Sequence, residues 1–298
     1  MTAFKRIFFW FLINAAVIAV IMTIVSVFGL DIHYLKPYGL DLKSLAILSL
    51  LWGFAGSFIS LCLSKFLAKR MLGVKIIDQP QNHDEIFLTE IIGRLASQGG
   101  FKTPEIGIYA SPEVNAFATG ATKNSSLVAV SQGLLNEMDK DEIEGVIAHE
   151  MAHIQNGDMV TMALLQGVIN AFVIFFARVA AYAVQTALGK SGDEIGGLAY
   201  WVTSILFEIL FSALASVIVF AFSRWREYRA DFGGASFVGK QKMIAALKRL
   251  QNTQNKIDSR QKSLSTMKIA NKASFARFFS THPRLDDRIK RLQQAPIS

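Results

Sequence analysis

Four long runs of apolar residues, separated by polar segments, dominate the pattern of this chain. The runs are residues 7–29, 42–64, 159–188 and 198–222. About 20 apolar residues are enough for a helix that crosses roughly 30 Å of hydrocarbon. The first run is also too long for the apolar core of a secretory signal, which has roughly 7–15 residues. The pattern therefore predicts four transmembrane helices, arranged as two hairpins.

Two charged side chains interrupt the second pair of runs. Arg178 lies in the third run and Glu208 in the fourth, at similar distances from the polar turn at residues 189–197. A lone charge inside hydrocarbon costs at least a few kcal/mol, whereas a paired charge is tolerated. We therefore expect Arg178 and Glu208 to pair across the hairpin. The alternative is that each one faces a water-filled cleft that leads toward the functional site.

The stretch between the hairpins, residues 65–158, has the pattern of a small soluble domain. Its expected elements are a helix near residues 86–98, strands at 105–110, 115–119 and 127–131, and a final amphipathic helix. The polar segment 120–126 joins the second and third strands as a turn. The pattern therefore predicts an α+β domain with a small antiparallel sheet beside its helices.

The second of these strands contains Asn115, Ala116, Phe117 and Ala118, in which small residues surround one aromatic residue. An edge strand of this kind has unpaired backbone groups that can bind an extended peptide. An ordinary edge strand without a ligand fits the spacing equally well. The four residues are candidates for binding the backbone of a substrate.

The C-terminal part, residues 223–298, is predicted to be helical. Its polar middle, residues 251–265, fits either a loop or an exposed helix. Near the end, Pro283 and the acidic residues that follow it are typical of the first turn of an amphipathic helix. His282 directly precedes this turn, where it can donate a hydrogen bond to an oxyanion or help to cap the helix.

Composition agrees with a membrane protein and narrows the expected partners. Hydrophobic residues make up 52% of the chain, more than an ordinary soluble protein carries. The net charge of +8 is concentrated in residues 223–298, where a basic surface suits the anionic headgroups of a lipid bilayer. This part lacks stacking aromatics on a strand platform, so nucleic acid is not an expected partner. The single cysteine, Cys62, excludes an internal disulfide.

Basic residues beside the apolar runs predict the orientation in the membrane. They cluster before the first run, after the second and after the fourth, at Lys5, Arg6, Lys65, Lys69, Arg70, Lys75, Arg224, Arg226 and Arg229. Such residues tend to stay on the cytoplasmic side. We therefore expect both termini and the soluble domain to face the cytoplasm.

The final helix of the soluble stretch carries the most specific chemistry. His149 and His153 lie four residues apart, and Glu150 directly follows the first histidine. On a helix the two imidazoles share one face, so each can give a neutral nitrogen to one zinc ion. Glu150 then lies beside the metal, where its carboxylate can take a proton from water. Asp139 and Glu142 have the spacing of a capping box that begins this helix.

A zinc hydrolase needs a third protein ligand and one open coordination position. Glu227 is our candidate, because it follows the fourth apolar run and shares a helical face with Asp231. Asp231 is then placed to accept the other ring proton of a ligating histidine. Without the histidine motif, pairing of these acids with neighbouring arginines would be the simpler interpretation.

Four motifs together resemble the HtpX family of bacterial membrane zinc metallopeptidases, relatives of the CAAX prenyl proteases. They are His149-Glu150-x-x-His153, Glu227-x-x-x-Asp231, Asn115-Ala-Phe-Ala-Thr-Gly120 and His282-Pro-x-Leu-x-x-Arg288. The resemblance covers nearly the whole chain. It implies one Zn²⁺ held by His149, His153 and Glu227, acid/base catalysis by Glu150, and degradation of misfolded or damaged membrane proteins in quality control and the stress response.

The resemblance also implies a mainly α integral membrane protein of the bacterial inner membrane, with a zincin-like cytoplasmic domain. The expected parts are an N-terminal membrane hairpin, a catalytic subdomain with the zinc helix, a second membrane hairpin and a helical part that completes the zinc site, at residues 1–64, 65–158, 159–222 and 223–298. The sequence Asn156-Gly157-Asp158 is expected to end the zinc helix and support the site.

Three other functions would also explain some of these residues. An intramembrane protease is disfavoured because the histidine helix carries too many polar side chains to lie in hydrocarbon. A zinc transporter is disfavoured because the four apolar runs contain no histidine. A zinc-stabilised membrane scaffold or chaperone would leave Glu150 dispensable, which an experiment can decide.

Overall fold

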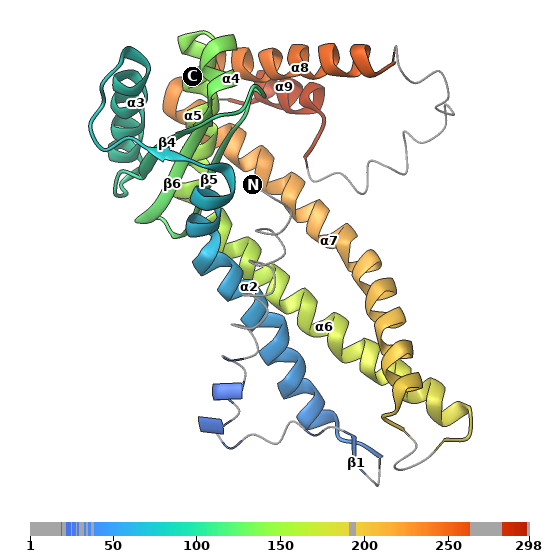
Figure 1. The fold of residues 1–298 in the computed structure, drawn as a ribbon. Coiled ribbons are helices and arrows are strands. Elements are labelled where there is room, and N and C mark those ends of the chain that lie inside the picture. The colour runs from blue at the N-terminus through green and yellow to red at the C-terminus, as the bar shows by residue number, and fades with distance from the viewer. Residues whose placement is uncertain are drawn as a thin grey trace. The chain divides into compact units, whose positions relative to one another are not determined.

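The structure, a computed structural model, describes residues 39–190, 195–262 and 282–296, with scattered positions between 19 and 36. The chain divides into two compact units. The first unit consists of residues 1–61 and 161–219, and the second of residues 62–160 and 220–298. Each of the three long helices α2, α6 and α7, drawn as the long ribbons in Figure 1, contributes residues to both units.

Among the described residues, three helices are long and apolar enough to cross a membrane. They are α2 (Leu42–Leu72), α6 (Asp158–Ala187) and α7 (Leu198–Val238). These helices coincide with three of the four predicted spans, but α2 and α7 continue well past the apolar runs because no proline interrupts them. The first predicted span, residues 7–29, lies outside the described residues except for a few helical positions.

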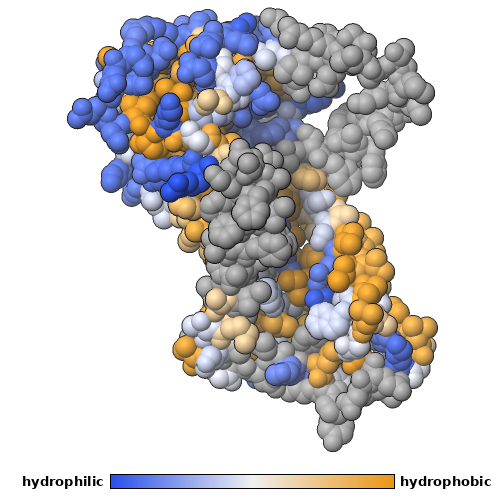
Figure 2. Space-filling view, viewed as in Figure 1, coloured by the Kyte–Doolittle hydropathy of each residue, from blue (hydrophilic) through white to orange (hydrophobic). Residues whose placement is uncertain are grey.

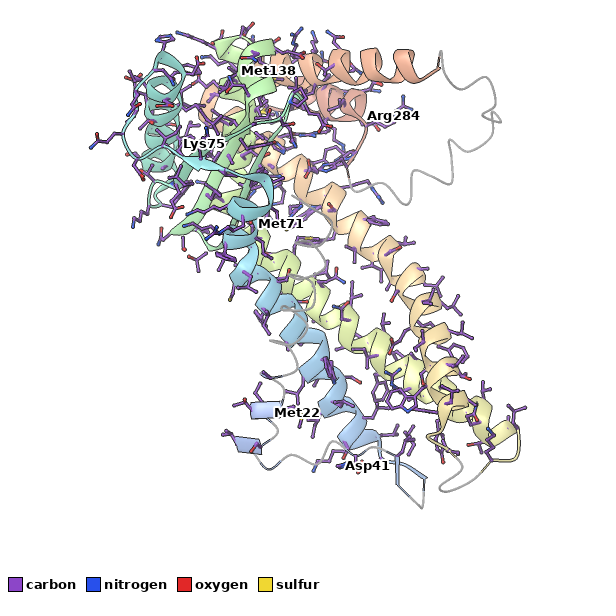
Figure 3. All side chains as sticks on the ribbon, viewed as in Figure 1. Met22, Asp41, Met71, Lys75, Met138 and Arg284 are labelled. Carbon is purple, nitrogen blue, oxygen red and sulfur yellow. The ribbon has the colours of Figure 1, made fainter. Side chains whose placement is uncertain are left out.

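The backbones of α2 and α6 lie unusually close in the first unit. A Cβ atom on Gly53 would lie 2.5 Å from the backbone nitrogen of Ala171 and 2.7 Å from the carbonyl oxygen of Gly167. Small residues at such a contact allow membrane helices to pack closely. At the start of α2, Asp41 accepts hydrogen bonds from the backbone nitrogens of Lys43 and Ser44 and so caps the helix (Figure 3).

The expected pairing of charges across the second hairpin is confirmed. Nη1 of Arg178 on α6 lies 2.6 Å from Oε1 of Glu208 on α7. The guanidinium of Arg178 also lies over the ring of Trp201, 5.0 Å from its centroid. The pair and the aromatic ring together give the arginine partners that hydrocarbon does not offer.

Because these two charges compensate each other, Arg178→Ala and Glu208→Ala are each expected to lower the free energy of unfolding of the hairpin. The double variant should be no less stable than either single variant, with a coupling of about 0.5–3 kcal/mol. Unfolding of the four proteins in matched detergent micelles measures this cycle. Strictly additive losses would contradict a direct pairing.

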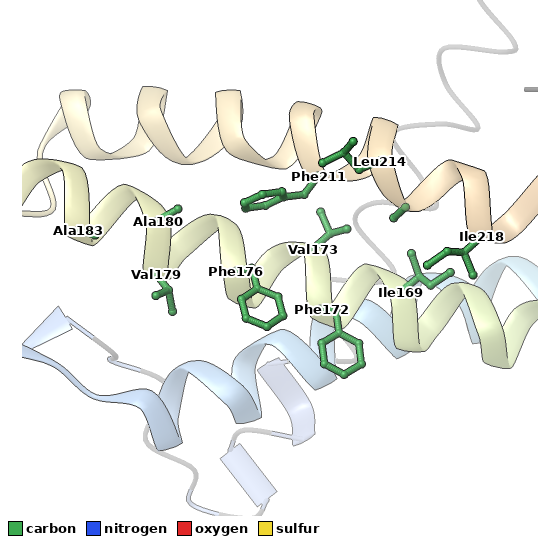
Figure 4. Close-up of a pocket in the computed structure, with 11 residues that line it drawn as sticks. Ile169, Phe172, Val173, Phe176, Val179, Ala180, Ala183, Phe211, Leu214 and Ile218 are labelled. Atoms are coloured by element: carbon green, nitrogen blue, oxygen red, sulfur yellow. The ribbon is translucent and has the colours of Figure 1, made fainter. Parts of the chain in front are cut away.

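The outward faces of α6 and α7 are strongly apolar. Exposed large side chains include Phe172, Phe176, Ile209, Leu214 and Ile218. A groove of about 570 Å³ between the two helices is lined by apolar residues (Figure 4), and Figure 2 shows apolar residues gathered over this part of the surface. An exposed apolar surface of this kind marks contact with lipid or another apolar partner.

The second unit contains a four-stranded sheet with the order β3-β4-β6-β5. Its strands are β3 (Lys75–Ile76), β4 (Glu105–Tyr109), β5 (Ala116–Thr122) and β6 (Ser125–Ser131). β5 and β6 form the expected antiparallel hairpin, but β4 pairs with β6 in parallel. The prediction of an antiparallel sheet is therefore wrong, and the sheet is mixed. After β4 the chain first forms β5 at the far side of the sheet and then forms β6 between β4 and β5. β5 is therefore an edge strand.

Among the described residues of the second unit, five helices complete the fold, together with the ends of the long helices. Their bounds are α3 (His83–Gly99), α4 (Gln132–Glu137), α5 (Lys140–Asn156), α8 (Lys240–Lys262) and α9 (Leu285–Gln294). Residues 251–262, for which the sequence left two possibilities, are therefore helical. The first unit adds a short ladder of β1 (Leu35–Lys36) and β2 (Gly39–Leu40).

The core of the second unit lies between one face of the sheet and helices α3 and α5. Leu88, Ile92 and Leu95 of α3 and Ile147 and Met151 of α5 are fully buried there, against the β6 residues Val128 and Val130. The α5 helix is thus held on both its sheet side and its α3 side. Because α5 is packed on these two sides, the side chains on its other face have little freedom to move.

Candidate metal centre

The helix that carries the two histidines has a defined start and a defined end. Asp139 accepts a hydrogen bond from the backbone nitrogen of Glu142 at 2.9 Å, and Glu142 accepts one from the backbone nitrogen of Asp139 at 3.1 Å. The predicted capping box is therefore confirmed. Gly157 ends the helix with a φ of 68°, which favours glycine. The next helix begins at Asp158, whose carboxylate lies beside His153.

Glycines allow α7 and α8 to approach α5 closely. A Cβ atom on Gly234 of α7 would lie 3.1 Å from the backbone nitrogen of His149, and one on Gly233 would lie 2.7 Å from Cβ of Ala152. A Cβ atom on Gly145 of α5 would lie 2.6 Å from the carbonyl oxygen of Lys242. The close contact with α7 brings the carboxylate of Glu227 to the histidine face of α5.

His149, His153 and Glu227 converge on one point. Nε2 of His149 lies 3.2 Å from Nε2 of His153, and each of these nitrogens lies 3.5 Å from a different oxygen of Glu227. A tetrahedral zinc ion with bonds of about 2.0–2.1 Å separates its ligand atoms by about 3.3–3.4 Å. The spacing and the donor types of these three residues fit such an ion.

Two carboxylates fix the other nitrogen of each imidazole. Nδ1 of His149 lies 3.0 Å from Oδ1 of Asp231, and Nδ1 of His153 lies 2.6 Å from Oδ2 of Asp158. A carboxylate at Nδ1 keeps the proton on that nitrogen and leaves the lone pair of Nε2 for a metal. Asp231 contacts a histidine of the site, as the sequence predicted. For Asp158 the sequence predicted only support of the site, and the structure shows that its carboxylate contacts His153.

Arg288 is the residue whose role the sequence did not reveal. Its guanidinium donates from Nε to Oδ2 of Asp231 at 2.8 Å and from Nη2 to Oδ1 at 2.6 Å, while Nη1 lies 3.4 Å from Oε2 of Glu227. The side chain is 8% exposed. A signal existed, because Arg288 interrupts the apolar stripe formed on α9 by Leu285, Ile289 and Leu292.

Because the fork of Arg288 orients both Asp231 and Glu227, Arg288→Met is expected to weaken metal binding by about 10–100-fold. Arg288→Lys should not restore it, since a lysine cannot make both hydrogen bonds to Asp231. Arg291→Met is the matched control, because Arg291 lies on the same helix against the ring of Tyr228. Metal content after dialysis against a weak chelator measures the difference. Equal retention by both variants would contradict this role.

Glu150 faces the edge strand of the sheet. Its Oε2 accepts a hydrogen bond from the backbone nitrogen of Ala118 on β5 at 2.9 Å. Asn115 and Ala116 line a cavity together with Glu150, whereas the ring of Phe117 packs on Tyr109 with centroids 5.6 Å apart. The predicted edge strand is confirmed as an edge, and Asn115, Ala116 and the backbone nitrogen of Ala118 lie beside the site.

His282 reaches the same centre from the segment that precedes α9. Its Nδ1 lies 3.1 Å from Oε2 of Glu227, and its side chain is 65% exposed. The N-cap of α9 is Arg284, which makes no side-chain capping hydrogen bond. His282 is therefore placed against Glu227 at the mouth of the site.

The surroundings of the two imidazoles raise the pKa of both side chains. Burial lowers the pKa of His149, but its hydrogen bonds to Asp231 and Glu227 outweigh burial and raise this pKa to about 9. For His153, burial likewise lowers the pKa, and the hydrogen bonds to Asp158 and Glu227 raise it above its ordinary value. A metal must displace these protons to bind Nε2.

Metal affinity is therefore expected to rise steeply with pH. Below about pH 6.5 both imidazoles carry a proton that the metal displaces, so affinity should rise about 100-fold per pH unit. Between the raised pKa of His153 and about 9, the pKa of His149, one proton remains to be displaced and the slope should fall to about tenfold. Competition with a chromogenic chelator measures the slope. His83→Ala, outside the site, should keep it, and a flat profile would contradict the assignment.

Comparisons with known proteins show which family this chain is similar to. The model of Peptidase family M48 matches residues 82–295. A protein named Protease HtpX homolog from Bacillus licheniformis is 47% identical, with 97% of this chain and 99% of that protein aligned. Protease HtpX from Hydrogenovibrio crunogenus is also 47% identical, with 97% and 96% aligned.

A solved structure shares the fold. The crystal structure of S. mikatae Ste24p superposes with a TM-score of 0.63 at 22% identity, over 97% of this chain. The chain spans 64% of the length of that protein. With the family match over most of the chain and the near full-length relatives, the conclusion is that the chain belongs to peptidase family M48, among the HtpX proteases.

Proposed function

We propose that this protein is a membrane-bound zinc endopeptidase that hydrolyses misfolded or damaged membrane proteins at the cytoplasmic face of the bacterial inner membrane. The observation that carries the proposal is the convergence of Nε2 of His149, Nε2 of His153 and the carboxylate of Glu227, with Glu150 beside them. Two imidazoles and one carboxylate are a ligand set of catalytic zinc sites, which keep a further position open.

The mechanism assigns a proton-transfer role to Glu150. Zinc, when bound, polarises the scissile carbonyl and makes water a better nucleophile. Glu150 accepts the proton of the attacking water and then passes it to the leaving amine. Its Oε2 already accepts the hydrogen bond from Ala118, which orients the carboxylate and leaves Oε1 for the proton. His282, at the mouth of the site, is proposed to donate a hydrogen bond to the oxyanion.

The substrate is proposed to bind as an extended chain along β5. This strand is one of the two edge strands of the sheet, and Ala116 lines the cavity that contains Glu150. Backbone hydrogen bonds to an edge strand give affinity that does not depend on the sequence of the substrate. Such binding suits an enzyme that acts on unfolded segments of many proteins.

The membrane location is supported by the three long apolar helices and by the basic residues that flank them. The histidine helix is packed against a sheet and other helices within the second unit. That setting disfavours the rival interpretation of a site buried in hydrocarbon. We propose that the site works in the cytoplasm, on segments exposed at the membrane surface.

The test uses the full chain reconstituted in vesicles with zinc. An unfolded soluble protein and a panel of destabilised membrane proteins should be cleaved, and folded forms of the same proteins should resist. Inverted membrane vesicles from expressing cells should cleave an added unfolded protein, whereas right-side-out vesicles should not. Removal of zinc by a chelator should stop cleavage, and added zinc should restore it. Cleavage that persists without metal would overturn the proposal.

A further inference from the structure

An aromatic residue and an arginine lie together where the apolar run of α7 ends. This run ends at residue 222, and Arg224 is the first charged residue after it. Trp225 is 51% exposed and packs on Phe222, with ring centroids 5.5 Å apart. The guanidinium of Arg229, one turn further along, lies over the ring of Trp225, 4.7 Å from its centroid. Tryptophan beside basic residues is typical of the level at which a transmembrane helix leaves the hydrocarbon.

Arg226 adds a second positive charge to the same face of α7. It lies three residues before Arg229, a spacing that places two side chains next to each other on a helix. Nε of Arg226 is buried, and it has no hydrogen-bond partner among the residues that the structure describes. Neighbouring like charges repel each other, and a buried donor without a partner is unfavourable. An anion next to the two guanidiniums relieves both penalties.

Arg229 can bind such an anion without losing its present contacts. Its side chain is exposed, and Nη2 donates a hydrogen bond to Oδ1 of Asn156 at 3.2 Å. A guanidinium has five N–H donors in a planar fork, which suits bidentate binding of a phosphate. Asn156 takes one of these donors, so further donors remain for an anion while Trp225 covers one face of the guanidinium.

The hydrogen bond to Asn156 also links Arg229 to the metal centre. Asn156 is the last residue of α5, and Asp158, two residues further along, contacts Nδ1 of His153 at 2.6 Å. Glu227 lies two residues before Arg229 on α7. A change at Arg229 therefore reaches the surroundings of two of the three proposed metal ligands. An anion bound there also screens positive charges that repel a metal ion.

We propose that Trp225, Arg226 and Arg229 form a site for the headgroup of an anionic phospholipid, and that lipid bound there strengthens metal binding at the neighbouring centre. A phospholipid is the occupant because the two arginines lie directly beyond an apolar helix long enough to cross a membrane. Free phosphate would meet the same charges but gain no contact from the exposed ring of Trp225. The inference rests on the membrane location in the proposed function, but not on peptide hydrolysis.

The first test titrates the detergent-purified full chain with phosphatidylglycerol, phosphatidylcholine and inorganic phosphate, and native mass spectrometry counts the bound molecules. Phosphatidylglycerol should bind about tenfold or more tightly than either alternative. Arg229→Gln should remove most of this preference. Arg70→Gln is the matched control and should keep it, because Arg70 lies over Phe66 at the end of α2, in the same kind of aromatic–arginine pair. Equal loss in both variants, or no preference for the anionic lipid, would overturn the site.

The second test uses the reciprocity of linked binding. Phosphatidylglycerol should raise the affinity for zinc about fivefold or more, and zinc must then raise the affinity for phosphatidylglycerol by the same factor. Competition with a chromogenic chelator gives the first half of this cycle, and lipid titration with and without zinc gives the second. Asn156→Ala should keep lipid binding but reduce the coupling.

Zinc affinity that phosphatidylglycerol leaves unchanged would overturn the proposal. Neither half of the cycle needs turnover, so the result is independent of hydrolysis. A protein that binds lipid and zinc cooperatively but cleaves nothing would support this inference, and only the proposed function would then fail.

Discussion

Glu150→Gln is expected to abolish peptide hydrolysis while the protein keeps its metal and its fold. The amide has nearly the same shape as the carboxylate but cannot take the proton of the attacking water. General acid/base catalysis contributes about 10²–10⁴-fold, so the rate should fall by at least that order. The ligand atoms of His149, His153 and Glu227 are untouched, so zinc content should match that of the parent protein.

The measurement compares initial rates and metal content of zinc-loaded protein in the same detergent. Glu90→Gln on α3 is the matched control, because Glu90 is exposed and lies on another helix. The control should retain the parent rate. Comparable turnover by Glu150→Gln and the parent would remove the peptidase mechanism and leave the alternative of a zinc-stabilised scaffold.

Glu227→Ala is expected to lose the metal as well as the activity. Two imidazoles alone leave the coordination incomplete, so affinity should fall by more than the ~10–100-fold that loss of a supporting partner costs. The change also removes the carboxylate that Arg288 and His282 contact. Glu90→Ala serves as the control for the loss of a carboxylate elsewhere.

Metal analysis after gel filtration checks this prediction, and thermal unfolding shows whether the variant still folds. Full zinc content in a folded Glu227→Ala protein would move the third ligand to another residue. His282 would then be the first candidate, since its Nδ1 lies 3.1 Å from the carboxylate of Glu227.

Sequence patterns predicted most of the local structure because local structure depends on neighbouring residues. The capping box of Asp139 and Glu142, the break at Gly157 and the hairpin of β5 and β6 each follow from spacings of a few residues. To predict the pairing of Arg178 with Glu208, it was also necessary to infer that the two residues lie at the same depth on two helices joined by a short turn. The fold and the general outline of the site were accessible in this way.

Long-range neighbours were less accessible. The parallel pairing of β4 with β6 depends on the path of the chain around the sheet, which alternation of side chains does not report. The role of Arg288 depends on the packing of α9 against α7, across a wide separation in the chain. A buried arginine within an apolar stripe indicates that a carboxylate is near, but it does not say which one.

The central claim is that His149, His153 and Glu227 hold a zinc ion at which peptides are hydrolysed. Zinc-edge X-ray absorption of the active, detergent-purified protein tests it most directly, combined with the number of zinc ions per chain. We predict one zinc per chain with only nitrogen and oxygen ligands at about 2.0–2.1 Å, including two imidazoles, and loss of that signal together with activity in His149→Ala. An active protein without zinc, or a zinc signal that His149→Ala leaves unchanged, would contradict the account.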